Sequence, residues 1–188
     1  MVLLHDSSLK RTAGINKNIW EYNYSDLIFV DVGSWFGTAY ASTPIPTLEQ
    51  VLQLTKGRIK VNIEIKDSQY NHNIVSQVTA LITQYNMEEE CSISSTNYQY
   101  LQEVRSINQY LTTGIILNRV SNPNLYPDVD FYSINYSLIT KELIYHIHGM
   151  GKKIHAWTVD GQADIDALYK MDVDNIITND PLTAAASF

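Results

Sequence analysis

The chain has 188 residues, of which 45% are hydrophobic, and a formal net charge of −7. A chain of this length buries roughly 70% of its unfolded surface, which is enough for one core, so we predict a single domain over residues 1–188. The 13 basic residues are scattered, whereas binding to nucleic acid or to an anionic membrane requires clustered Lys and Arg. The composition therefore argues against both as partners.

The N-terminal residues Met1–Leu4 are followed at once by His5 and Asp6, so they do not form an apolar core of signal-peptide length. No other stretch approaches the roughly 20 apolar residues of a membrane span. We expect a soluble chain that contacts a membrane only through a segment not present in it. The single cysteine, Cys91, cannot form an internal disulfide, so cysteine content does not indicate whether the protein works in an oxidising or a reducing compartment. The apolar residues around Cys91 in the sequence predict that it is a core residue.

Six apolar segments have the length and the residue types of β-strands. They are residues 59–66, 91–94, 113–117, 131–134, 153–159 and 175–178. Between them, apolar residues recur at three- and four-residue spacing, most clearly over residues 74–85 and 101–107, which predicts helices. Helices would start after Ser95-Thr96-Asn97, at Thr140 and after Asp160-Gly161. Strands that alternate with helices predict parallel pairing through right-handed crossovers.

Parallel strands with helical crossovers form either a doubly wound sheet or a β/α barrel. No glycine-rich phosphate loop follows a strand, which disfavours the nucleotide-binding doubly wound sheet. Polar residues follow the strands instead, as Glu64, Lys66 and Asn135 do, and a barrel would place them at one mouth. A complete barrel has eight units and typically about 250 residues. We therefore predict an α/β fold, a TIM (β/α) barrel that lacks its first two strands, with six parallel strands in this chain.

An incomplete barrel has two unpaired strand edges, here at residues 59–66 and 175–178. Val2-Leu3-Leu4 or another chain could cover them. Because exposed strand edges recruit partners, any self-association is expected to use these edges.

The first strand segment has one polar face. Its apolar residues Ile59, Val61, Ile63 and Ile65 alternate with the polar residues Asn62, Glu64 and Lys66. A carboxylate and an ammonium group therefore lie side by side on one face. A solvated face of an edge strand would have the same pattern, so this segment by itself does not separate a site from a surface.

Five motifs occur in the order and at the spacing of one known family. They are Val2-Leu3-Leu4-His5-Asp6 with Arg11-Thr12 and Gly14, Ile45-Pro46-Thr47-Leu48-Glu49-Gln50-Val51-Leu52, Ile63-Glu64-Ile65-Lys66, His155-Ala156-Trp157-Thr158-Val159, and Asp174-Asn175-Ile176-Ile177-Thr178-Asn179-Asp180-Pro181. Through them the chain resembles the glycerophosphodiester phosphodiesterase family over essentially its whole length. It corresponds to the C-terminal three quarters of that family's catalytic barrel.

The resemblance implies metal-dependent hydrolysis of a small glycerophosphodiester to glycerol 3-phosphate and an alcohol. His5 matches one of the family's two histidines for proton transfer, a task that suits an imidazole because it titrates near neutral pH. Glu64 matches a metal-binding glutamate, and Lys66 matches a lysine that contacts the phosphate. Trp157 matches the tryptophan that flanks the glycerol moiety, although a core position would suit it equally. The implied cofactor is a divalent cation, calcium before magnesium.

The sequence departs from the family pattern in its first part. The family's His-Arg-Gly, Pro-Glu-Asn and Glu-x-Asp motifs have no counterpart in the 188 residues. The resemblance therefore implies a chain with one of two catalytic histidines and one of three metal carboxylates, and in some members a preceding segment holds membrane spans. Three functions stay open. They are a phosphodiesterase with part of its site outside this chain, a non-catalytic barrel fragment or binding module, and a phospholipase-type phosphodiesterase with a similar barrel.

Overall fold

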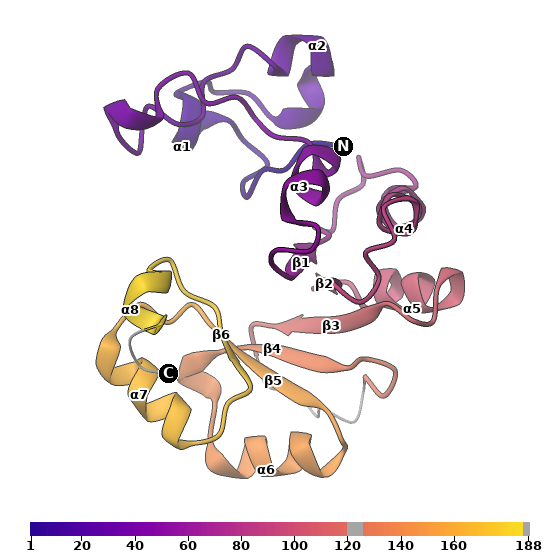
Figure 1. Cartoon of the computed structure of the whole chain (residues 1–188), viewed down its shortest axis with the longest axis vertical. Coiled ribbons are helices and arrows are strands. Elements are labelled where there is room, and N and C mark those ends of the chain that lie inside the picture. The colour runs from indigo at the N-terminus through magenta and orange to yellow at the C-terminus, as the bar shows by residue number, and fades with distance from the viewer. Residues whose placement is uncertain (120–125, 186–188) are drawn as a thin grey trace. The chain divides into compact units, whose positions relative to one another are not determined.

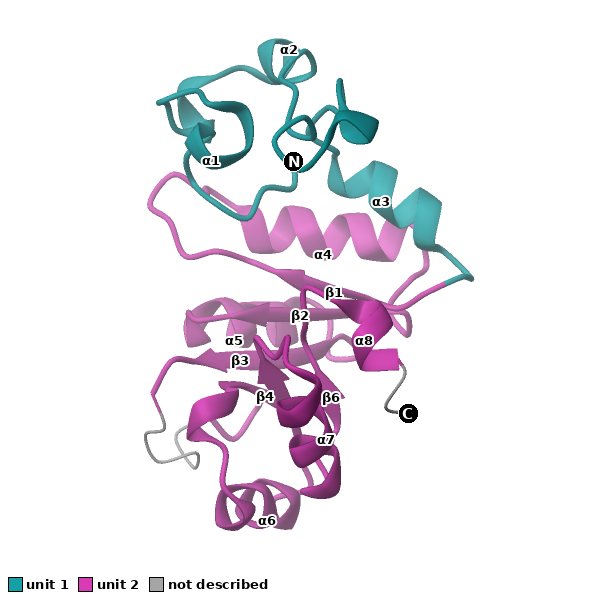
Figure 2. Ribbon diagram, turned by 90° about the vertical axis from the view of Figure 1, so that its left-hand side faces the viewer, with its two compact units in different colours: residues 1–58 teal, residues 59–188 magenta. Residues whose placement is uncertain are grey.

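The computed structural model describes residues 1–119 and 126–185. By its internal contacts the chain divides into two compact units, residues 1–58 and residues 59–188, drawn in teal and magenta in Figure 2. The first unit consists of short helices and loops, and the second contains the sheet. The single domain predicted over residues 1–188 stays a prediction.

Residues 1–58 fold around a small core of three buried side chains, Leu9, Leu27 and Ile45. The helices of this unit are α1 (Lys10–Ala13), η1 (Ile19–Glu21), α2 (Tyr24–Leu27), η2 (Thr38–Tyr40) and α3 (Leu48–Thr55). The longest, α3, begins after Thr47, whose hydroxyl accepts a hydrogen bond from the backbone N–H of Gln50. The Gln50 side chain accepts one from the Thr47 N–H in return. This reciprocal capping stabilises the start of α3.

Residues 59–188 contain a sheet of six parallel strands whose order in space follows the chain (Figure 1). The strands are β1 (Val61–Glu64), β2 (Cys91–Ser95), β3 (Thr112–Leu117), β4 (Phe131–Asn135), β5 (Lys153–Trp157) and β6 (Asn175–Ile176). The predicted α/β fold with six parallel strands, curled into part of a barrel, is confirmed. Three strands are shorter than predicted. β1 starts at Val61 and ends at Glu64, β5 ends at Trp157, and β6 has only two residues.

The strands are joined by helices that start where the sequence indicated. These are α4 (Ile74–Gln84), α5 (Tyr98–Ile107), α6 (Lys141–Gly149), α7 (Gln162–Lys170) and α8 (Pro181–Ala185), with the turn η4 (Tyr136–Leu138) after β4. The Asn97 side chain accepts from the Gln99 N–H, and the Thr140 hydroxyl accepts from the Leu143 N–H. Each side chain therefore satisfies a backbone donor that the first helical turn leaves free.

The two faces of the sheet differ in chemistry. Side chains alternate along each strand, and paired residues of parallel strands share a face. One face is apolar and buried, with α5 packed on β2 and β3 and α6 packed on β5. Its side chains include Ile63, Ile93, Ile115, Ile134, Ile154 and Ala156. The opposite face, called the inner face below, carries Glu64, Ser94, Ser133, His155 and Trp157. Glu64, His155 and Trp157 therefore lie on the face opposite these apolar side chains.

Gly114 is required where β3 meets β4 on the inner face. A Cβ atom at this position would lie 2.0 Å from the Phe131 ring, which is 1% exposed. Because overpacking a core costs about 1 to 3 kcal/mol, Gly114→Ala should lower the free energy of unfolding in urea by about 2 kcal/mol. Adding Phe131→Leu should recover part of the loss. Gly149→Ala, which meets no atom within 4 Å, is the control, and an equal loss there would refute the steric account.

The outer strands of the sheet are β1 and β6, as expected for an incomplete barrel. Val2 forms an isolated antiparallel bridge with Thr47. In the part of the chain that the structure describes, no helix has the length and apolar character to cross a membrane. Cys91 is 4% exposed, which confirms the predicted core position, and burial raises the pKa of its thiol to about 11.

Candidate active site

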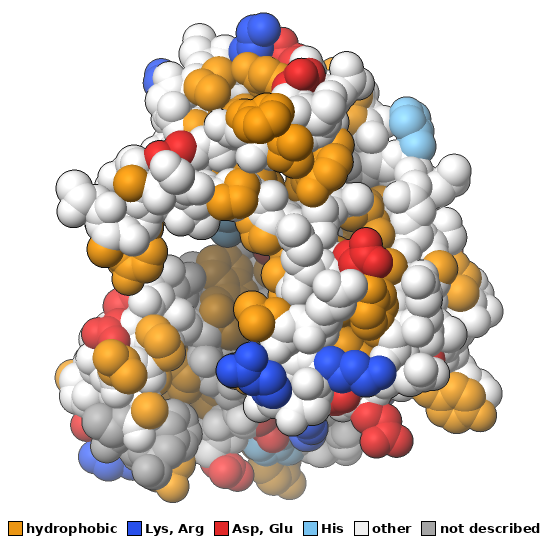
Figure 3. Space-filling view, turned by 45° about the horizontal axis from the view of Figure 1, so that its top comes forward, with side chains coloured by type: hydrophobic (Ala, Val, Ile, Leu, Met, Phe, Trp, Pro, Cys, Tyr) orange, Lys and Arg blue, Asp and Glu red, His pale blue; other side chains and the backbone are white. Residues whose placement is uncertain are grey.

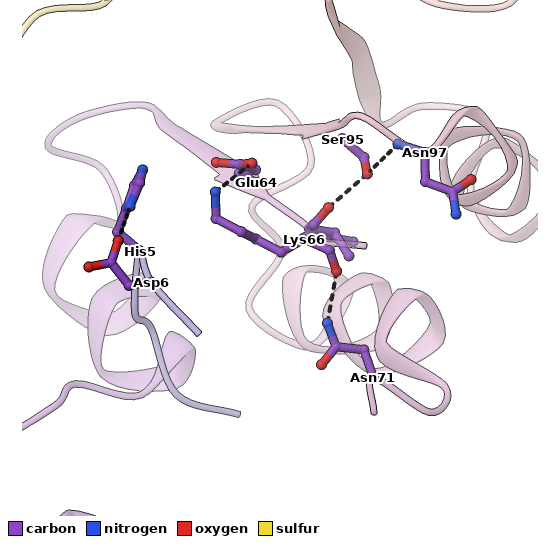
Figure 4. A network of polar contacts seen from close by, with 8 residues as sticks. His5, Asp6, Glu64, Lys66, Asn71, Ser95 and Asn97 are labelled. Carbon is purple, nitrogen blue, oxygen red and sulfur yellow. Dashed lines mark hydrogen bonds and ion pairs between the residues drawn. The ribbon is translucent and has the colours of Figure 1, made fainter. Parts of the chain in front are cut away.

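Glu64 and Lys66 meet at the carboxyl end of β1. The Lys66 ammonium donates to Glu64 Oε1 over 2.9 Å, and both side chains are between one third and one half exposed. Figure 4 shows the ammonium group turned back toward the carboxylate. A partly exposed pair of this kind adds little to stability, on the order of 0 to 1 kcal/mol. Both groups are therefore accessible to a ligand at small cost to the fold.

The backbone under this pair is held by side chains from neighbouring segments (Figure 4). The Ser95 hydroxyl donates to the Ile65 carbonyl over 2.7 Å and accepts from the Asn97 N–H. The Asn71 amide donates to the Lys66 carbonyl over 2.8 Å. These bonds fix the chain just beyond the strand, where its carbonyls leave the regular ladder. The charged pair is therefore presented from an ordered segment.

Within residues 1–119 and 126–185, three buried side-chain atoms of the inner face have no hydrogen-bond partner. They are Ser94 Oγ, His155 Nδ1 and Trp157 Nε1. Leaving a buried donor or acceptor unpaired costs about 1 to 3 kcal/mol, so such atoms indicate a place for a polar ligand or for ordered water. Glu64 pairs with Ser94 in register and Trp157 lies on the same face of β5. The inner face thus offers hydrogen-bonding groups, of which Ser94 lies on the strand next to Glu64.

Sequence reasoning did not single out His155, which lies two residues before Trp157 on the same face of β5. Its ring stacks on Phe131, with 4.1 Å between centroids and 16° between planes. Burial lowers the pKa of the imidazole to about 4, so the side chain is neutral near pH 7. The alternating pattern of β5 could have indicated His155 as a site residue, because it places a histidine and a tryptophan side by side on the inner face.

The depressed pKa of His155 predicts loss of stability in mild acid. In the unfolded chain the His155 imidazole binds a proton near pH 6.5, whereas in the folded chain it does so only near pH 4. The free energy of unfolding is therefore highest above pH 6.5 and falls as the pH drops from 6.5 to about 4. The loss should reach about 3 kcal/mol for this group. In the His155→Gln variant, the free energy of unfolding measured in urea should depend less on pH between pH 6.5 and 4. His146→Gln, on the exposed surface of α6, is the control, and equal slopes for both variants would contradict the assignment.

His5 lies in the first unit and belongs to a short chain of polar contacts. Its Nδ1 is 2.7 Å from Asp6 Oδ1, and Arg11 Nε donates to Asp6 Oδ2 over 2.6 Å. The hydrogen bonds from Arg11 and from His5 hold the pKa of Asp6 below its usual range. A carboxylate only accepts, so Nδ1 carries the proton of the neutral ring and Nε2 is the basic atom. The side chain of His5 is 75% exposed, which leaves Nε2 available.

Asp160 ties together the loops that follow β5 and β6. Its Oδ1 accepts from the Asn179 N–H over 2.7 Å and from the Thr178 hydroxyl over 3.0 Å, and its Oδ2 accepts from the Asn179 amide. These bonds, led by the one from the Asn179 backbone, lower the pKa of Asp160. Asp160 thus orders the segment just beyond Trp157. The sequence motif of residues 174–181 contains Thr178 and Asn179, but it does not indicate their bonds to Asp160.

Glu64 has the hard oxygen donors that calcium and magnesium prefer. In residues 1–119 and 126–185, no three His, Cys, Asp or Glu side chains are grouped so that they could hold a metal ion. Calcium takes about six to eight oxygen ligands, and one carboxylate falls well short of that number. The type of donor therefore fits a divalent cation, and the number of ligands in the described chain does not.

The fold and these residues agree with one family. The model of the glycerophosphoryl diester phosphodiesterase family matches residues 1–183. The chain belongs to this family. The resemblance that the five motifs indicated is thereby confirmed.

Known members show how far the match extends. A glycerophosphodiester phosphodiesterase of Caldanaerobacter subterraneus is 31% identical over 189 residues, which cover 97% of this chain and 78% of that protein. A human lysophospholipase D is 27% identical over 131 residues, or 64% of this chain and 39% of that protein. The structure of an Oleispira antarctica phosphodiesterase in complex with its product, sn-glycerol-3-phosphate, has a TM-score of 0.92 at 21% identity and covers 99% of this chain and 78% of its own. That likeness confirms the fold.

Proposed function

We propose that the chain carries part of the active site of a phosphodiesterase that hydrolyses a glycerophosphodiester to sn-glycerol 3-phosphate and an alcohol. The observation that carries this proposal is the Glu64–Lys66 pair, held 2.9 Å apart at the end of β1 in a member of this family. The Oleispira relative was solved with sn-glycerol-3-phosphate bound, and we extend that product to this chain.

Each candidate residue has a role that suits its chemistry. The Lys66 ammonium would bind a non-bridging phosphoryl oxygen and stabilise the charge that grows there in the transition state. His5 Nε2 would exchange a proton with the attacking or the leaving oxygen, while Asp6 keeps the ring in the required tautomer. Trp157 would offer an apolar wall and its unpartnered Nε1–H donor to the glycerol moiety. In the hydrolysis the water oxygen bonds to phosphorus, the bond to the alcohol breaks, and the alcohol oxygen is protonated.

Glu64 would supply one oxygen to a divalent cation, with calcium preferred to magnesium. A bound cation would stabilise negative charge on the phosphoryl oxygens. Because this chain contributes too few ligands by itself, we assign no step of the reaction to the metal. We further propose that the 188 residues alone are a weak catalyst, since they carry one histidine and one carboxylate of the implied set.

A lysophospholipid is the second candidate substrate, because the match to the human lysophospholipase D covers 64% of this chain. The two substrates are separated by incubating the chain with glycerophosphocholine or with lysophosphatidylcholine and analysing the products by mass spectrometry. We expect sn-glycerol 3-phosphate and choline from the first substrate and little product from the second. Lysophosphatidic acid as the main product would favour the second candidate, and no product from either would favour a non-catalytic module.

A further inference from the structure

Exposed apolar side chains concentrate in one part of the first unit. Seven of the 16 large hydrophobic residues that are exposed in the described chain lie within residues 20–40, namely Trp20, Tyr24, Ile28, Phe29, Trp35, Phe36 and Tyr40. Phe29 is 84% exposed and Phe36 is 68% exposed. On the face of residues 1–58 that Figure 3 presents, orange hydrophobic side chains gather among white ones. Exposed aromatic residues at this density mark an interaction surface.

Three of these rings form a contiguous group, called the aromatic cluster below. Trp35 meets Phe36 edge to face with 5.7 Å between centroids, and Phe36 meets Tyr40 in the same way at 5.1 Å. The rings are displayed by an ordered loop, because Asp31 accepts hydrogen bonds from the backbone N–H groups of Gly33, Ser34 and Ser42. The hydrogen bond from the Ser34 hydroxyl, together with these backbone bonds, holds the pKa of Asp31 far below its usual range. Binding would therefore require little further ordering of the loop.

Basic side chains lie against the aromatic rings. The Arg11 guanidinium is 5.1 Å from the centre of the Trp35 ring, and the Lys17 ammonium is 5.4 Å from that of Tyr22. Residues 1–58 hold five Lys or Arg and five Asp or Glu, so their net charge is zero and the whole −7 lies in residues 59–188. The excess negative charge of the chain therefore does not lie in this unit.

We infer that the aromatic cluster, with Phe29 and Arg11, is a docking surface for a phospholipid bilayer. Trp, Tyr and Phe favour the boundary between headgroups and acyl chains, where an apolar ring and a polar edge are both accommodated. Cationic side chains beside them interact with lipid phosphates. A second copy of the chain is a poorer occupant, because face-to-face pairing would bring two Arg11 side chains toward each other. The inference goes beyond the proposed function, and it can be tested without turnover.

The test measures binding of the full chain to vesicles of phosphatidylcholine and phosphatidylglycerol in equal parts. We expect the chain to sediment with the vesicles and its tryptophan emission to shift to the blue. Phe36→Ser and Phe29→Ser should each lower the partition coefficient by about tenfold, because each removes a large exposed apolar surface. Tyr110→Ser is the matched control, since this ring is 79% exposed in residues 59–188 and should have no effect. Thermal unfolding of all variants checks that they fold.

Four results would overturn the inference. The first is an unchanged chain that does not bind the vesicles, and the second is an equal loss of binding in Phe36→Ser and Tyr110→Ser. The third is a dimer of the unchanged chain that Phe36→Ser dissociates, which would identify a second copy as the occupant. The fourth is a raised KM of Phe36→Ser for soluble glycerophosphocholine with vesicle binding intact, which would assign the ring to substrate. Failure of the proposed function would leave the vesicle result unaffected.

Discussion

Replacing His5 with alanine should lower kcat for glycerophosphocholine by about 10²- to 10⁴-fold, because the variant lacks a proton transfer made only in the transition state. KM should change little, since the imidazole contributes nothing to ground-state binding of the phosphate. The measurement is the initial rate of glycerol 3-phosphate release, at a chain concentration high enough for the unchanged protein to give a linear signal. Asp6→Asn, which removes the carboxylate that fixes the ring, should give a smaller loss.

The matched control is His146→Gln, an exposed histidine of α6, for which we expect the rate of the unchanged chain. A fall in kcat that is equal in His5→Ala and His146→Gln would remove His5 from the proposed reaction. A raised KM with unchanged kcat would assign His5 to binding instead of proton transfer.

The 188-residue chain should hydrolyse glycerophosphocholine about 10² to 10⁴ times more slowly than the complete Caldanaerobacter relative, because one general acid–base group alone is worth that factor. The comparison uses kcat/KM of both proteins in calcium-containing buffer. Removal of calcium with a chelator should change the rate of this chain little, since a single carboxylate binds calcium weakly. Turnover by this chain at the relative's rate would show that its 188 residues suffice for catalysis.

The sheet could be predicted from sequence because its strands alternate or are continuously apolar. Ile63, Ile93 and Ile154 are buried where the period-two pattern placed them. The strand ends were less certain, since Ile59 continues the pattern of β1 although it is 65% exposed. An alternating hydrophobic pattern indicates which face of a strand is buried. It does not indicate how far the neighbouring strand extends, and that pairing determines where the strand ends.

The first unit could not be predicted in the same way. Its core of Leu9, Leu27 and Ile45 is assembled from loops that have no period. The carboxylate that orders one of its loops, Asp31, accepts from backbone N–H groups, as Asp160 does in residues 59–188. Such hydrogen bonds depend on how the loop folds in space, and the residue types alone do not predict that. The charged pair was visible because Glu64 and Lys66 stand two residues apart in an alternating segment, although β1 itself ends at Glu64.

The most direct test of the proposed active site follows glycerophosphocholine by ³¹P NMR during long incubations with the unchanged chain and with Lys66→Ala. The variant should fold, because the Lys66 side chain is 41% exposed and its ion pair adds little stability. We expect the signal of sn-glycerol 3-phosphate to grow with the unchanged chain and to stay at background with Lys66→Ala. Growth of this signal at the same rate in both samples, or a phosphocholine signal in its place, would contradict this expectation.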